Sequence, residues 1–276
     1  MRKIEAIILC MVMCFSVVSC GGTTDAFTDT QSPISSEQVN DTISQETTDT
    51  DVQAGLEQDT QKDTERDTEK AQLTTYKLKD NVDKFKLHGR MSVLSTGITC
   101  DFSASGIEFN AYVTGDVTLK VTATKDTYFT VWVDGKRSSE RLYAPKNTTE
   151  LKVASFEEAG EHTIRILKQS EAAMSLCVLN TLTLTGELRE PPTAAKYFIE
   201  IIGDSITCGQ GNLVMKGDEG QGKAIAEDGT QTFCFLAADS LGADCSIIGR
   251  SGIGIDKGYT EYSEMDFYPK TSYCRS

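Results

Sequence analysis

Short stretches of alternating apolar and polar residues recur between residues 76 and 190. Clear examples are residues 106–112, 117–121 and 129–133, and shorter ones follow at 151–153, 162–166 and 178–184. Asp134-Gly135 directly after the third stretch is a strong signal for a hairpin turn. Many short strands separated by turn residues are typical of a β-sandwich. We therefore predict a sandwich domain over residues 76–192, which the pair Pro191-Pro192 ends.

A different pattern begins after the prolines. Phe198, Ile199, Ile201 and Ile202 form a short apolar run that indicates a buried strand. Residues 230–241 have helical spacing and Thr230 or Thr232 as a cap, and residues 245–248 form a second apolar run. The order strand, helix, strand predicts a parallel βαβ unit, so residues 193–276 are expected to belong to an α/β domain.

The first of these apolar runs leads into the string GDSITCGQG at residues 203–211. Reactive groups in α/β sheets collect at the carboxyl ends of strands, so the Ser205 hydroxyl is expected to be exposed there. Its own N–H can help to stabilise a developing oxyanion, while Gly203 and Asp204 shape the turn. The alternative is an ordinary turn, since Gly, Asp and Ser are common turn residues.

The second apolar run leads into Arg250-Ser251-Gly252-Ile253-Gly254. Because parallel strands end at one edge of a sheet, Ser205 and Gly252 are expected to be neighbours. The Gly252 N–H, free of a side chain, would then be a second oxyanion donor. A flexible loop is the alternative interpretation of Gly252 and Gly254.

Residues 1–19 have the features of a signal peptide: Arg2 and Lys3 precede a mostly apolar run that is short for a membrane span. The run ends in Val17-Val18-Ser19-Cys20, which resembles a bacterial lipobox, in which Cys20 would become the lipidated first residue. The alternatives are an ordinary secretory signal and an uncleaved anchor. Each alternative predicts export, and lipidation would tie the protein to a membrane at the cell surface.

The formal net charge of −14 is concentrated near the N-terminus. Residues 21–75 hold 13 acidic and three basic side chains, a net charge of −10, and few aromatic rings. Such a stretch cannot bury enough apolar surface to fold, so residues 20–75 are predicted to be a disordered spacer. A nucleic-acid partner is not expected, because it requires a basic surface.

Three of the nine cysteines fall at or before Cys20. The others show no CxxC or CxxH spacing, so no metal site is predicted. Export permits disulfides and buried free thiols are the equal alternative. These six residues are Cys100, Cys177, Cys208, Cys234, Cys245 and Cys274.

Three rings of the predicted sandwich have alternative roles. Trp132 could stack on a sugar, but the alternation around it favours packing. His88 and His162 are the only histidines of the chain. Both lie outside the segment that carries Ser205, so structural roles are favoured over a role as its base.

Three strings together resemble carbohydrate esterase family 2: GEHTIRILKQSE at 160–171, FIEIIGDSITCGQGN at 198–212 and RSGIG at 250–254. The resemblance implies a jelly-roll domain followed by an SGNH (GDSL-type) hydrolase domain. It implies that Ser205 attacks the acetyl group of acetylated xylan or mannan, with the N–H groups of Ser205 and Gly252 as oxyanion donors. It also implies that no cofactor is used.

The sequence departs from the family pattern after Ser205. The family uses a later Asn donor and a His near the C-terminus, whereas Asn212 is the only Asn there and no His follows. A serine without a base is a poor nucleophile, so we expect a C-terminally truncated, inactive member. The alternative function is that of a non-catalytic, carbohydrate-binding surface lipoprotein.

Overall fold

The computed structural model describes residues 72–254 of the 276-residue chain, and all of them belong to one compact unit. The predicted signal peptide 1–19, Cys20 and nearly all of the spacer 20–75 lie outside the described residues. Residues 255–276 of the predicted α/β domain, including Cys274, also lie outside them. No helix within 72–254 is long and apolar enough to cross a membrane.

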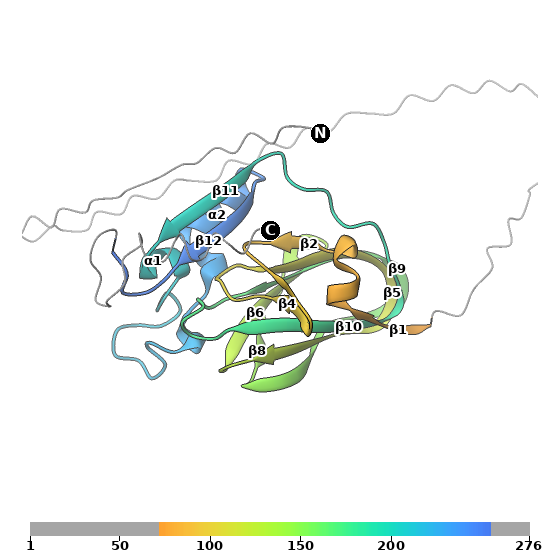
Figure 1. Ribbon diagram of the computed structural model, residues 1–276, viewed down its shortest axis with the longest axis horizontal. Coiled ribbons are helices and arrows are strands. Elements are labelled where there is room, and N and C mark those ends of the chain that lie inside the picture. The colour runs from red at the N-terminus through yellow and green to blue at the C-terminus, as the bar shows by residue number, and fades with distance from the viewer. Residues whose placement is uncertain (1–71, 255–276) are drawn as a thin grey trace, which may run out of the picture. The chain divides into compact units, whose positions relative to one another are not determined.

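Ten strands form one mostly antiparallel sheet, consistent with the predicted sandwich. In the sheet the strand order is β3-β4-β10-β5-β9-β6-β7, with β1 on β10, β2 on β5 and β8 on β6. Figure 1 shows β5, β9 and β10 running alongside one another. The strands are β1 (Leu73–Lys77), β2 (Lys86–His88), β3 (Val93–Leu94), β4 (Gly97–Thr99), β5 (Gly106–Ala123), β6 (Thr127–Val133), β7 (Lys136–Arg137), β8 (Leu142–Ala144), β9 (Asn147–Lys168) and β10 (Cys177–Leu188). The 3-10 helices η1 (Leu78–Asp80) and η2 (Val82–Lys84) follow β1.

The prediction of separate short strands was wrong for the two longest elements. The stretches 106–112 and 117–121 both belong to β5, and 151–153 and 162–166 both belong to β9. The β5–β9 ladder continues through a register shift at Val113 and Gly115, where Gly115 has φ +69°. A bulge therefore bends each strand without ending it, and the alternation pattern alone cannot tell such a bulge from a turn.

The predicted start of the sandwich at residue 76 was also late, because β1 begins at Leu73. Residues Leu73 to Lys77 pair with β10, and the hydroxyls of Thr75 and Thr183 lie 2.9 Å apart. In the sequence, the threonines at positions 74 and 75 resemble the Thr-rich spacer before them. Threonine nevertheless favours a strand when a partner strand such as β10 is available.

The core of the sandwich follows the alternation that the sequence displays. Ile107, Phe109 and Leu119 of β5 are fully buried, as are Ile164 and Ile166 of β9. The hairpin prediction is confirmed: β6 and β7 pair, and the turn residues Asp134 and Gly135 have φ +50° and +76°. The five described cysteines are buried free thiols: Cys100, Cys177, Cys208, Cys234 and Cys245.

The α/β segment after the prolines contains two parallel strands and two helices. Strands β11 (Phe198–Gly203) and β12 (Asp244–Gly249) pair in register, and helices α1 (Ser205–Cys208) and α2 (Phe233–Ser240) lie between them in the chain. Thr232, one of the two expected caps, accepts a hydrogen bond from the Phe235 N–H. The two 3-10 helices η3 (Ala224–Ala226) and η4 (Gly229–Gln231) precede α2.

A second apolar cluster joins this segment to the sandwich. Trp132 and Leu167 of the sandwich pack with Phe235 of α2 and Ile247 of β12. The Trp132 and Phe235 rings lie 5.9 Å apart, and Trp132 is only 7% exposed. The prediction that Trp132 packs in the interior is confirmed, and its ring is not available as a sugar platform.

Candidate active site

Ser205 is the first residue of α1, immediately after β11 and the Gly203-Asp204 turn. The Asp204 carboxylate accepts a hydrogen bond of 3.0 Å from the Ile206 N–H and so caps α1. Gly209, with φ +86°, ends the helix after one turn. Ser205 as a residue is partly exposed to solvent.

Two glycines allow α1 to lie directly against the strand ends. A Cβ at Gly203 would be 2.1 Å from the Thr207 hydroxyl oxygen, and one at Gly249 would be 3.0 Å from Cys208. Gly203 and Gly249 are also partners in the β11–β12 register. Glycine at both positions is therefore a packing requirement of the Ser205 turn.

The turn that carries Gly252 lies beside the Ser205 turn. The Arg250 N–H donates to the Gly203 carbonyl at 3.1 Å, which extends the parallel ladder past β12. The Ser251 hydroxyl lies 3.6 Å from the Cys208 sulfur of α1. Gly252 has φ +81°, a conformation that glycine adopts without strain. The structure thus brings the two predicted oxyanion turns to one edge.

The two histidines occupy the sandwich, each bonded to a carboxylate. His88 Nε2 lies 2.8 Å from Glu108 Oε2, and the His88 side chain is 8% exposed. His162 Nδ1 lies 2.8 Å from Asp134 Oδ2, and its ring stacks on Phe156. Within residues 72–254 neither imidazole hydrogen-bonds to Ser205. The predicted stretch 162–166 does not begin a separate strand at His162, because His162 lies within β9.

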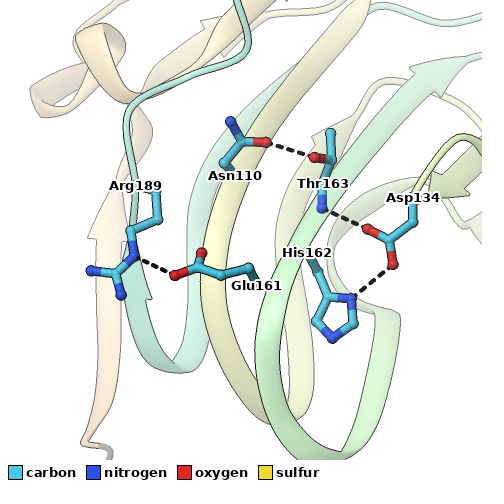
Figure 2. A pocket seen from close by; sticks show the side chains of 6 residues that line it. All are labelled: Asn110, Asp134, Glu161, His162, Thr163 and Arg189. Carbon is cyan, nitrogen blue, oxygen red and sulfur yellow. Dashed lines mark hydrogen bonds and ion pairs between the residues drawn. The ribbon is translucent and has the colours of Figure 1, made fainter.

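His162 lines a pocket on the sandwich, shown in Figure 2. Its polar groups are paired with one another: His162 Nδ1 lies 2.8 Å from Asp134 Oδ2, and the Arg189 guanidinium lies 3.0 Å from Glu161. The Asp134 carboxylate also accepts from the Thr163 N–H. The polar groups of this pocket therefore already hydrogen-bond to one another. Its lining residues are Asn110, Asp134, Glu161, His162, Thr163 and Arg189.

Sequence reasoning missed a buried acidic cluster next to the Ser205 turn. Glu171 follows β9 and Glu227 follows η3, and both are fully buried. Glu227 lies in the polar, Gly-rich segment 217–229. Oxygen atoms of both carboxylates and the Cys208 sulfur lie within 4.8 Å of one another. These three are ligand types that could hold a metal ion, although no spacing motif marks them in the sequence.

The buried acidic cluster alters the ionisation of its members. Burial, and then the Glu171 charge, raise the pKa of Glu227 to about 8. Burial and the two neighbouring carboxylates also raise the pKa of the Cys208 thiol well above its usual range. At neutral pH we therefore expect Cys208 to be a thiol and Glu227 to retain a proton.

Buried polar contacts hold the α/β segment against the sandwich. Asp228, fully buried, accepts from the Arg137 guanidinium at 2.6 Å, and Arg90 donates to Glu200 at 2.8 Å. The Ser103 hydroxyl donates to the Cys208 carbonyl at the end of α1. The sandwich is therefore part of the framework that positions the Ser205 turn.

The fold and the site together define a class: a β-sandwich protein with a serine at the carboxyl end of a parallel strand, beside a glycine turn. Residues 87–192 match the family model for the carbohydrate esterase 2 N-terminal region. Solved structures with this fold include a family two carbohydrate esterase from Clostridium thermocellum in complex with cellohexaose. It is 26% identical, with a TM-score of 0.58, over 68% of this chain and 58% of that one.

Two curated relatives agree with this assignment. The cellulase/esterase CelE of Acetivibrio thermocellus is 29% identical over 184 residues, which are 63% of this chain and 22% of that protein. The acetylxylan esterase / glucomannan deacetylase of Cellvibrio japonicus is 30% identical over 139 residues, 49% of this chain and 38% of that protein. The chain is thus similar to carbohydrate esterase family 2 proteins, and the match to the family model lies in residues 87–192. It spans well under half the length of either curated relative.

Proposed function

We propose that this protein is an acetyl esterase for acetylated plant polysaccharide and that Ser205 is its nucleophile. One observation carries the proposal: Ser205 opens a capped helix at the end of β11, beside the Gly252 turn at the end of the parallel strand β12. We further propose that residues 193–276 belong to an SGNH-type hydrolase domain. The match of residues 87–192 to the family model supports the reaction class, and the name of the Cellvibrio japonicus relative, an acetylxylan esterase / glucomannan deacetylase, supports the substrate class.

In the proposed reaction the Ser205 hydroxyl oxygen attacks the acetyl carbonyl carbon while a base takes the hydroxyl proton. The carbonyl oxygen becomes an oxyanion, which the N–H groups of Ser205 and Gly252 would stabilise. Collapse of this intermediate breaks the bond to the sugar oxygen, which takes the proton and leaves. Water then attacks the acetyl-serine, releasing acetate and restoring the Ser205 hydroxyl.

Within residues 72–254, neither histidine is placed to act as a base for Ser205. The sequence has two histidines, and both are bonded to carboxylates in the sandwich. A serine without a base is weakly nucleophilic, so this chain alone is proposed to release acetate slowly. Free imidazole supplies the same general base from solution and is expected to accelerate the reaction.

We also propose that the protein is exported and held at a membrane by a lipid on Cys20. The basic Arg2 and Lys3, the apolar run and the Val17-Val18-Ser19-Cys20 string support this proposal. The acidic spacer would then separate the lipid from the sandwich. Metabolic labelling with an alkyne fatty acid tests it: the label should enter the protein and be lost in Cys20→Ala.

The esterase proposal is tested by acetate release from acetylated xylan, measured with and without imidazole. We expect slow release that imidazole accelerates and that Ser205→Ala abolishes. Ser240→Ala, which changes an exposed serine of α2, is the matched control and should behave like the unaltered protein. Imidazole-dependent release that is equal in Ser205→Ala would overturn the proposal. Sugar binding without serine-dependent release would favour a non-catalytic binding module.

A further inference from the structure

Two buried carboxylates meet where the sandwich contacts the α/β segment. Glu171 belongs to the sandwich side and Glu227 to the α/β side, and neither side chain is accessible to solvent. The Glu171 N–H donates to Glu227 Oε1 at 2.8 Å, so the two residues are directly linked. Two carboxylates buried this close cannot both keep a negative charge without a large energetic cost.

One oxygen of each carboxylate lacks a hydrogen-bond partner: Oε1 of Glu171 and Oε2 of Glu227. A buried polar atom normally has a hydrogen-bond partner, so we expect a proton or an ion between these two oxygens. The Cys208 thiol lies in the same buried acidic cluster but is a weak donor. A proton shared by the two carboxylates would satisfy both oxygens.

The charges around the pair agree with a single proton. The Lys168 ammonium, fully buried, donates to the carbonyls of Glu171, Ser170 and Asp101. Lys168 and one ionised carboxylate of the pair cancel, and the Asp101 carboxylate then leaves a net charge of −1, whereas a second ionised carboxylate in the pair would make it −2. The Asp101 carboxylate, which accepts from the Cys177 N–H, is the other acidic group near Lys168. A divalent cation would instead place more positive charge next to Lys168.

The second oxygen of Glu171 reaches the predicted oxyanion turn. Glu171 Oε2 accepts a hydrogen bond of 2.9 Å from the Ser251 N–H, across 80 residues of chain. Ser251 immediately precedes Gly252, so this bond fixes the peptide that leads to the Gly252 N–H.

We propose that Glu171 is a positioning residue of the esterase site: it shares one proton with Glu227 and holds the Ser251-Gly252 turn beside α1. This inference rests on the function proposed above. Glu171 does not touch the substrate. It acts through the Ser251 N–H, and the proton on the pair keeps the Glu171 carboxylate in place.

The first test is the pH dependence of unfolding, measured on the full chain. The folded state holds a proton on the pair that the unfolded chain releases near pH 4.5, so stability should fall as pH rises from about 5 to about 8. We expect the folding constant to fall by at least about 100-fold over this range. In Glu227→Gln, whose amide mimics the protonated acid, this fall should disappear. Glu219→Gln, an exposed residue of the same loop, is the control and should keep it.

The second test is hydrogen exchange in the peptide that contains Ser251. Glu171→Ala removes the acceptor, so exchange should accelerate there by about 10-fold or more. Glu171→Gln keeps an acceptor oxygen and should restore the slow rate. A purely structural contribution of Glu171 would accelerate exchange evenly over β11 and β12, and that result would overturn the proposal.

The third test distinguishes a proton from a metal ion. Addition of ZnCl2 or CaCl2 should leave the melting temperature of the full chain unchanged. A metal-dependent rise that Glu227→Gln abolishes would overturn the shared proton in favour of a metal site. All three tests measure stability or exchange, so a failure of acetate release alone would contradict the proposed function and leave these results interpretable.

Discussion

The Ser251 N–H donates to Glu171 Oε2 at 2.9 Å, which ties the turn after β12 to the end of the longest sandwich strand. The two residues lie on opposite sides of the contact between the sandwich and the α/β segment. This bond makes the sandwich a structural part of the candidate site.

Trp132→Ala is expected to loosen the α/β segment. The ring packs against Phe235 at 5.9 Å and lies under the Arg165 guanidinium at 4.3 Å. Removing a buried aromatic ring of this size costs about 3–5 kcal/mol. Denaturant unfolding should show this loss. Tyr197→Ala, which removes a ring that is 44% exposed, should cost less than about 1 kcal/mol. Equal losses in the two variants would contradict the buried role of Trp132.

Gly203→Ala is expected to displace α1. The new methyl group would lie 2.1 Å from the Thr207 hydroxyl oxygen, so the helix that begins at Ser205 must move. We predict a destabilisation of about 1–3 kcal/mol, together with loss of any serine-dependent acetate release. Gly211→Ala serves as control, because a Cβ there meets no atom within 4 Å. It should keep acetate release, although its φ of +75° carries a strain of about 1 kcal/mol. Unchanged release in Gly203→Ala would show that α1 tolerates the shift.

Asp228→Ala is expected to break the polar part of the contact. The carboxylate accepts from Arg137, Gln169 and Gln231 and is fully buried. Its loss leaves several donors unsatisfied, and we expect about 3 kcal/mol less stability. Asp239→Ala removes a carboxylate that is about half exposed and paired to Arg165 at 3.4 Å, and should cost less than about 1 kcal/mol. Thermal unfolding distinguishes the two, and a larger loss for Asp239→Ala would contradict this assignment.

The buried thiols are expected to resist alkylation in the native protein. Burial raises the pKa of Cys100 and Cys245 to about 12 and that of Cys234 to about 11. Only the thiolate reacts, so its fraction at pH 8 is about one in a thousand or less. Peptide mapping after iodoacetamide treatment should find these three residues unlabelled until denaturant is added. Native labelling of any of them would show that its site opens.

Much of the fold can be predicted from the local pattern of apolar and polar residues in the sequence. Alternating stretches between residues 106 and 184 predict the sandwich strands, and Asp134-Gly135 predicts a hairpin. The run 198–202, the Thr232 cap and the run 245–248 predict the parallel unit. The sequence pattern does not predict that two alternating stretches join into one long strand through a bulge. The glycine at position 115 is compatible with a bulge and with a turn.

The contact between the sandwich and the α/β segment could not be predicted from the sequence for another physical reason. Glu171, Glu227 and Asp228 are charged types that are rarely fully buried, so local sequence assigns them to the surface. Their burial depends on partners that lie 56 to 91 residues away in the chain. The prediction of Ser205 as a candidate nucleophile depends on a local sequence string, whereas the residues that hold its turn have no local signal.

Trapping the acetyl-enzyme tests the central claim most directly. The full chain would be incubated with an aryl acetate and imidazole, quenched in acid, and its peptides mapped by mass spectrometry. We predict an acetyl group on Ser205 that forms and decays with turnover, while Ser251 in the neighbouring turn stays unmodified. Acetate release from the full chain with no acetyl group on Ser205 at any time would contradict the account.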